Sequence, residues 1–96
     1  MPKKNQNIPK DYIHYKKTVS KVIGGRIRAR REKLNLSQEQ LRVALQLQGI
    51  YISRSQFSRL ESGETLPSAL EIKALASALD LSYSSLLDDI QITGNK

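Results

Sequence analysis

The sequence predicts an all-α fold of five short helices, and three observations lead to this prediction. Apolar residues recur at spacings of four, four and seven between Val19 and Leu34, as on one face of a helix. At three places a serine is followed three residues later by Gln or Glu, which is the capping box that begins a helix. Alternation of apolar and polar residues, the pattern of a strand, never continues beyond four residues. A chain of 96 residues is expected to form one domain.

The first 17 residues differ in composition from the rest of the chain. They include two prolines and five lysines but few apolar side chains. This composition predicts a flexible basic arm over residues 1–17. We expect one folded domain over residues 18–90 and a short tail at residues 91–96.

The first helix is expected to begin near Thr18, with Thr18 or Ser20 as its N-cap. Gly24 and Gly25 should weaken its N-terminal turns, because glycine is a poor helix former. The apolar stripe expected to face the core consists of Val19, Ile23, Ile27 and Leu34.

The three capping boxes mark the starts of the next three helices, and a fifth helix is expected after Ser82. The three boxes begin helices that run from Ser37 to about Gln48-Gly49, from Ser53 to Ser62-Gly63, and from Ser68 to about Asp80. The apolar residues expected to pack in these four helices are Leu41, Ala44, Leu45, Leu47, Phe57, Leu60, Ile72, Leu75, Ala76, Leu79, Leu86, Leu87 and Ile90.

The net charge of +7 is unevenly distributed along the chain. Residues 1–35 carry eleven Lys or Arg against two acids, whereas residues 64–96 carry two against five. A strongly basic N-terminal third attracts nucleic acid or an anionic membrane, and the alternative is a solvated charged face.

The composition disfavours several kinds of chemistry. Without cysteine, and with His14 as the single histidine, the chain offers no thiolate or histidine cluster, so we expect no metal site and no cofactor. No paired carboxylates suit acid–base catalysis, so we expect no catalytic residues and no enzyme. No apolar run is long enough to span a membrane or to serve as a signal peptide, and we therefore expect a cytoplasmic protein that contacts no membrane.

The predicted helix from Ser53 to Ser62 has two unlike faces. At 100° per residue, Phe57 and Leu60 point to one side. Short polar side chains with arginines on the other side suit a helix that enters a DNA major groove, although an ordinary serine-rich surface helix would look similar. The outward residues are Ser55, Ser58, Arg59 and Ser62, with Arg54 beside them.

Two opposite charges are expected to face the core. Arg31 lies on the inward stripe of the first helix, and Glu61 lies beside Phe57 and Leu60. Since an unpaired buried charge is costly, we expect a bidentate ion pair between them; the alternative is that both side chains extend to solvent.

These residues together resemble the Cro/phage-repressor-like (XRE-like) helix-turn-helix family over about residues 19–89. The resemblance implies a five-helix, lambda-repressor-like domain in which the second and third helices form the helix-turn-helix and the third reads DNA. The residues that carry it are Leu36-Ser37-Gln38-Glu39-Gln40-Leu41, the run from Ile52 to Gly63, Pro67, and the stretch from Ile72 to Ser82.

The resemblance also implies a role for individual residues. Gln38 would hold a DNA phosphate, and the Arg31 to Glu61 pair has a counterpart in many family members. Base edges would face Arg54, Ser55 and Arg59, with Ser53 and Ser58 closer to the DNA backbone.

The sequence departs from the family pattern in two places. The link from Gln48 to Ile52 makes the turn between the second and third helices longer than the usual three or four residues. Within it, Tyr51 would reach the DNA backbone or cap the core, and we favour the core. Arg42 stands where the family usually has a small alanine, so its side chain must point elsewhere, with phosphate as one destination.

The sequence thus predicts a small, repressor-like transcription regulator that binds double-stranded DNA sequence-specifically. The alternative is a protein-interaction adaptor, or an antitoxin-type protein, that binds an unidentified protein partner with the same helical domain. We expect a homodimer on two half-sites. Its interface would be an apolar patch of Leu70, Ala74, Leu87 and Ile90, which could also be scattered surface residues.

Overall fold

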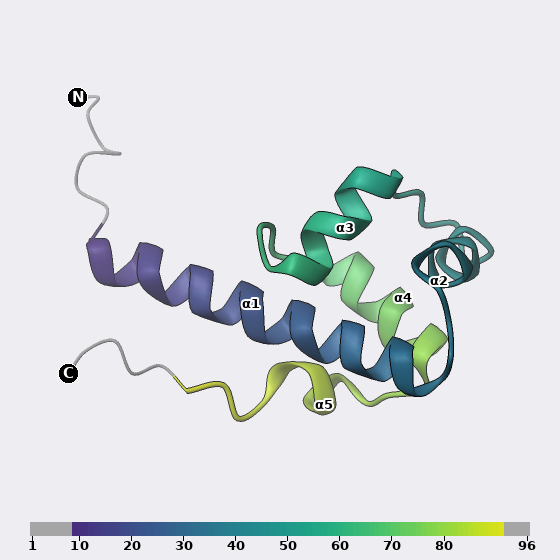
Figure 1. Ribbon diagram of the computed structural model, residues 1–96. Coiled ribbons are helices and arrows are strands. Elements are labelled where there is room, and N and C mark those ends of the chain that lie inside the picture. The colour runs from purple at the N-terminus through teal and green to yellow at the C-terminus, as the bar shows by residue number, and fades with distance from the viewer. Residues whose placement is uncertain (1–8, 92–96) are drawn as a thin grey trace.

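A computed structural model describes residues 9–91, and all regular secondary structure in this range is helical. The prediction of an all-α fold with five helices is confirmed, and Figure 1 shows α1 running along the whole molecule with the other helices packed around its C-terminal half. The helices are α1 (Lys10–Lys33), α2 (Gln38–Gln46), α3 (Arg54–Ser62), α4 (Ala69–Leu79) and α5 (Tyr83–Leu87).

Helix α1 begins at Lys10, so the predicted start near Thr18 was wrong and the helix is not short. Pro9 occupies the N-cap with φ −64° and ψ 144°, where its missing N–H leaves no hydrogen bond unmade. Asp11 stabilises the first turn, because its negative charge interacts favourably with the positive end of the helix dipole. Ser20 does not cap the helix, because its hydroxyl donates to the Lys16 carbonyl at 2.8 Å. Part of the segment expected to be a flexible arm is therefore helical, while residues 1–8 lie outside the described residues.

Gly24 permits α1 and the C-terminal end of α3 to pack closely. A Cβ at Gly24 would collide with the carbonyl oxygen of Leu60 and would lie 2.7 Å from that of Glu61. A Cβ at Gly25 would meet nothing within 4 Å. The two glycines looked alike in the sequence, but only Gly24 is required by the packing.

The three predicted capping boxes all form. In each box the serine hydroxyl accepts from the backbone N–H three residues later, and the Gln or Glu side chain accepts from the serine N–H. Gly63 ends α3 with φ +83°, a left-handed conformation that glycine adopts without strain. These local signals therefore place α2, α3 and α4 where the sequence predicted them.

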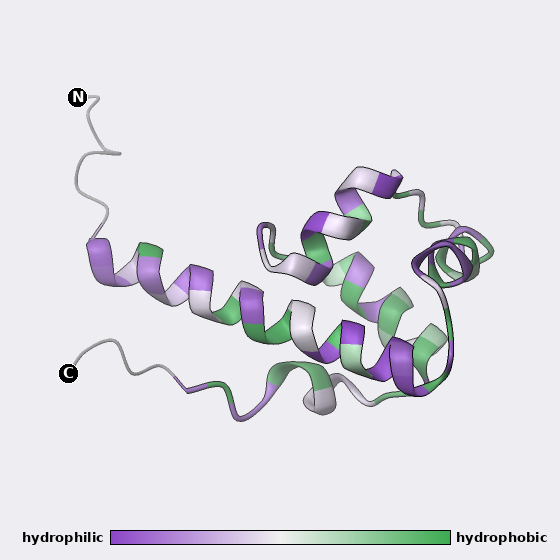
Figure 2. Cartoon of the chain, in the orientation of Figure 1, coloured by the Kyte–Doolittle hydropathy of each residue, from purple (hydrophilic) through white to green (hydrophobic). Residues whose placement is uncertain are grey.

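The core lies between the C-terminal half of α1 and the other four helices, and α4, which is coloured mostly as hydrophobic in Figure 2, supplies five of its residues. Leu34 and Leu47, expected inside, are exposed because α1 and α2 end just before them and the chain turns away. Leu87 is also exposed. The fully buried side chains are Ile27, Leu41, Leu45, Phe57, Leu75, Leu79 and Leu86.

Two arginines of α1 hold the C-terminal ends of α4 and α5. Arg26 donates to the carbonyls of Leu86 at 3.2 Å and Asp88 at 2.6 Å. Arg30 donates to the Leu79 carbonyl at 2.9 Å through Nε. Part of the basic charge in the first third of the chain therefore serves the fold, because it caps helix ends that have unpaired carbonyls.

No helix in the described part of the chain has the length and hydropathy needed to cross a membrane.

Candidate nucleic-acid interface

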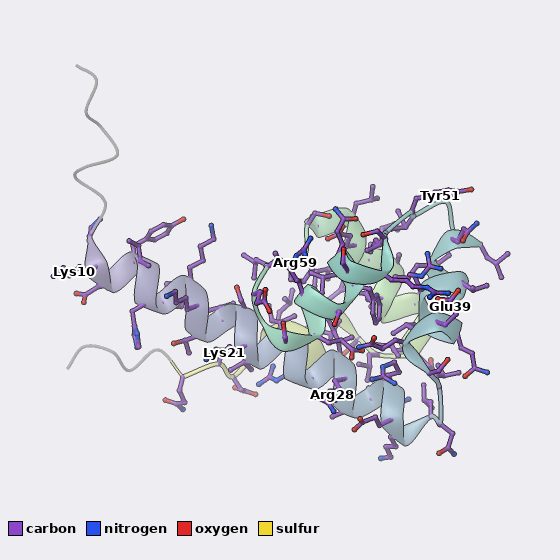
Figure 3. All side chains as sticks on the ribbon, turned by 45° about the horizontal axis from the view of Figure 1, so that its top comes forward. Lys10, Lys21, Arg28, Glu39, Tyr51 and Arg59 are labelled. Carbon is purple, nitrogen blue, oxygen red and sulfur yellow. The ribbon has the colours of Figure 1, made fainter. Side chains whose placement is uncertain are left out.

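Helix α3 presents a polar, cationic face to solvent and buries the other. Phe57, Leu60 and Glu61 are buried, the first two in the core. Because the buried face is held against α1 and α2, the orientation of the outer face is fixed by the fold. The outer residues Arg54, Ser55, Ser58, Arg59 and Ser62 are all exposed, and Figure 3 shows Arg59 on this side of the molecule.

Ser53 lies at the N-terminal end of this face and also begins the helix. Its hydroxyl accepts from the Gln56 backbone N–H at 3.1 Å and lies 3.4 Å from the Ser55 hydroxyl. Ser53 is exposed, so it caps the helix at the surface of the molecule.

The expected contact between Arg31 and Glu61 forms. Arg31 Nε donates to Glu61 Oε2 at 2.6 Å, and Nη2 donates to Oε1 at 3.0 Å. The hydrogen bonds to Glu61 raise the pKa of Arg31 above its ordinary value, against the effect of burial. The third donor, Nη1, reaches the Leu36 carbonyl at 2.7 Å, so one side chain joins α1, α3 and the segment that precedes α2.

Gln38 belongs to the same network, a contact that the sequence did not predict. Its Nε2 donates one hydrogen to Glu61 Oε1 at 2.9 Å. The other hydrogen of Nε2 remains, together with the backbone N–H of Gln38 at the start of α2, where the helix dipole favours an anion.

A second network links α2 to the beginning of α3 through Glu39, a residue the sequence reasoning did not assign. Arg42 donates to both carboxylate oxygens of Glu39, at 3.2 and 2.8 Å, and Arg54 Nε lies 3.4 Å from Glu39 Oε1. The hydrogen bonds from Arg42 hold the pKa of Glu39 below its usual range. The spacing of Glu39 and Arg42 already suggested their pairing, but the contact with Arg54 needed the fold.

The long link between α2 and α3 differs from our expectation at Tyr51. Its side chain is 74% exposed and extends from the link in Figure 3, so the favoured packing against the core was wrong. Ile52 is buried instead, at 5% exposure. DNA phosphate was one predicted partner of the Arg42 side chain. In the structure Arg42 donates through Nη1 to the Ile52 carbonyl at 3.1 Å.

The lysines in the N-terminal half of α1 form no ion pair or side-chain hydrogen bond among the described residues, as is also true of Lys33, Arg59 and Lys73. They are exposed, and the first turns of α1 extend beyond the other helices in Figure 1, whereas Lys21 lies next to Gly63 at the end of α3. Arg28, by comparison, forms a surface ion pair with Glu32 at 3.1 Å. The exposed lysines of this half are Lys10, Lys16, Lys17 and Lys21.

Comparison with known families gives a match. The model of a family described as a helix-turn-helix domain matches residues 22–87, more than two thirds of the chain. The match includes α2 to α5 entirely and begins within α1, so the N-terminal turns of α1 lie outside it. Neither a curated protein nor a solved structure matches the chain.

Proposed function

The chain belongs to the helix-turn-helix domain family, and from this premise we propose that it is a sequence-specific regulator that binds double-stranded DNA. The membership agrees with the resemblance to Cro/phage-repressor-like proteins. In this proposal α2 and α3 are the helix-turn-helix, α3 lies in the major groove, and the protein acts as a repressor-like transcription regulator.

The division of α3 into two faces carries the proposal. An α-helix fits the major groove only if its outer side chains allow close approach and offer donors or acceptors to base edges. The serines of the outer face are short, and its two arginines, Arg54 and Arg59, carry planar donor groups that match guanine O6 and N7. The buried face, with Glu61 in its ion pair, holds the helix at a defined angle.

We assign the contacts as the resemblance to the family implies, and every α3 side chain in the assignment is exposed. Base edges are the partners of Arg54, Ser55 and Arg59, and DNA phosphates are the partners of Ser53 and Ser58. Gln38 binds a phosphate through its backbone N–H and the amide hydrogen that Glu61 leaves free.

The exposed lysines of α1 add sequence-independent attraction to DNA. In this assignment residues 18–90 are the DNA-binding domain, and residues 1–17 are a basic segment in which α1 begins at Lys10. The predicted tail at residues 91–96 lies outside the described residues except for Gln91.

We propose a homodimer that forms through the exposed apolar side chains of α4 and α5. Leu70 and Tyr83 are 61% and 52% exposed, and Leu87 lies beside Tyr83 along one apolar hollow. Ala74 and Ile90, which the sequence placed in this patch, do not belong to it, because Ala74 is buried and Ile90 packs against the core.

Selection of bound sequences from a random duplex pool, with the full chain, tests the proposal. We expect one enriched motif, repeated at a centre-to-centre distance of about 10 bp if a dimer binds. A pool that stays random would overturn the proposal and would favour the protein-interaction adaptor. Sedimentation of the wild type and of Leu70→Glu tests the dimer, and a wild type that stays monomeric on and off DNA would overturn that part.

A further inference from the structure

We infer that Glu39, held in place by Arg42, is a positioning residue that sets the base preference of Arg54. The inference rests on the proposed function, since it deepens the role of Arg54 in reading DNA. It adds two residues of α2 that the contact assignment does not use.

Arg54 is the most exposed member of this group of three. Its side chain is 80% exposed, so without a partner it would sample many rotamers. The contact with Glu39 uses Nε, at 3.4 Å from Oε1. No hydrogen bond or ion pair of the two terminal nitrogens is formed among the described residues, and these are the atoms that bond guanine in a bidentate contact.

Glu39 is itself held in one geometry. Arg42 binds both of its carboxylate oxygens, and the Arg42 side chain is only 22% exposed. A carboxylate gripped at both oxygens has little rotational freedom, so its position is passed on to Arg54.

The third donor of Arg42 connects the Glu39 and Arg42 pair to the long link before α3. Nη1 bonds the Ile52 carbonyl, two residues before Arg54. With the buried Ile52 side chain, this bond fixes the end of the link relative to α2. Arg42 therefore determines the position of the Arg54 backbone as well as that of its carboxylate partner.

The energetics favour orientation over stability as the role of the Glu39 to Arg54 contact. An ion pair this exposed contributes little to the free energy of unfolding. The same contact can restrict the rotamers of an arginine in the free protein, which reduces the conformational entropy lost when the arginine binds a base.

Glu39→Gln is the direct test, with Glu32→Gln as the matched control. Both remove one exposed carboxylate that pairs with an arginine, so both raise affinity for all DNA, and this sequence-independent effect cancels in a ratio of two affinities. The Arg54→Ala variant first identifies the base pair at which preference is lost. The measurement is then the affinity for the selected duplex divided by the affinity for a duplex changed only at that base pair.

We expect Glu39→Gln to lower this ratio about two- to fivefold, the range of an exposed ion pair, and Glu32→Gln to leave it unchanged. In the Arg54→Ala background, Glu39→Gln should change nothing further. Arg42→Lys, which keeps the charge without the planar fork, should lower the ratio in the same direction. Circular dichroism melts confirm that the variants stay folded.

Three results would overturn the inference and leave the proposed function intact. In the first, Glu39→Gln and Glu32→Gln change the ratio equally. In the second, the ratio rises in Glu39→Gln, which would mean that Glu39 keeps Arg54 away from DNA. In the third, the decrease in the ratio would persist without Arg54. A wild type that selects no sequence would instead overturn the proposed function and the inference together.

Discussion

Arg31 on α1 and Glu61 on α3 form a buried bidentate ion pair, with both side chains at least nine-tenths covered. Gln38 and the Leu36 carbonyl complete the hydrogen bonding around it. Among the described residues, every buried side-chain nitrogen and oxygen has a partner. The pair therefore fixes α3 against α1 with no buried charge left unsatisfied.

Removing one member of this pair should destabilise the fold strongly. Arg31→Leu or Glu61→Leu alone should lower the free energy of unfolding by about 3 to 5 kcal/mol, because each leaves a buried charge without its partner. The double replacement should recover much of this stability. Denaturant melts of the three variants measure this, and additive effects would contradict a direct coupling.

The capping boxes and the stripe on α1 were predictable because their physics is local or periodic. Ser37, Ser53 and Ser68 bind groups three residues away, so the sequence contains the whole interaction. The expected pair of Arg31 and Glu61 followed from two inward positions that each needed a partner.

The features that were missed depend on tertiary contacts. Arg26 binds carbonyls about 60 residues away, and nothing in the local pattern indicates those acceptors. Tyr51 and Ile52 are adjacent apolar residues of the link, and only Ile52 is buried. Which of the two packs against the core depends on the backbone path of the link, which the local sequence does not indicate. The start of α1 is a different case, since Pro9 and Asp11 indicate a helix N-terminus and were outweighed by the basic composition.

The close approach of α1 to α3 predicts opposite effects at two adjacent glycines. Gly24→Ala should lower the free energy of unfolding by about 1 to 3 kcal/mol, because its methyl group overlaps the carbonyls that end α3. Gly25→Ala should raise it by up to about 1 kcal/mol, because alanine is the better helix former and the site is open. Thermal melts of the two variants are the measurement, and equal effects would contradict the packing.

The hydrogen bonds of Arg26 predict a structural role for one of the basic residues of α1. Arg26→Ala should lower the free energy of unfolding by about 1 to 2 kcal/mol, because several helix-end carbonyls would be left without a charged donor. Arg28→Ala is the control, since it removes the same charge from a surface ion pair and should cost less than about 1 kcal/mol. Equal destabilisation in denaturant melts would argue against the hydrogen bonds to the carbonyls.

The exposed lysines of α1 should act on DNA affinity and not on base preference. Replacing Lys10, Lys16 and Lys17 with glutamine should weaken binding to all duplexes alike, because an ammonium group binds phosphate without reading bases. The slope of log K against log salt should flatten by about 0.9 for each phosphate that the variant no longer neutralises. Lys73→Gln on α4 should leave the slope unchanged, and an altered preferred site in the triple variant would mean that α1 reads a groove directly.

The two arginines of the α3 outer face, Arg54 and Arg59, should carry base preference. Arg54→Ala or Arg59→Ala should cost about 1 to 3 kcal/mol on the selected duplex and should relax selection at one base pair, because each removes a bidentate donor. Gln38→Ala should weaken binding without changing the preferred base, because its proposed partner is a phosphate. Affinities for selected and random duplexes at one salt concentration separate these cases. Equal weakening on both duplexes for the two arginine variants would place those side chains on phosphate, and base reading by α3 would then rest on Ser55 alone, too little for a specific site.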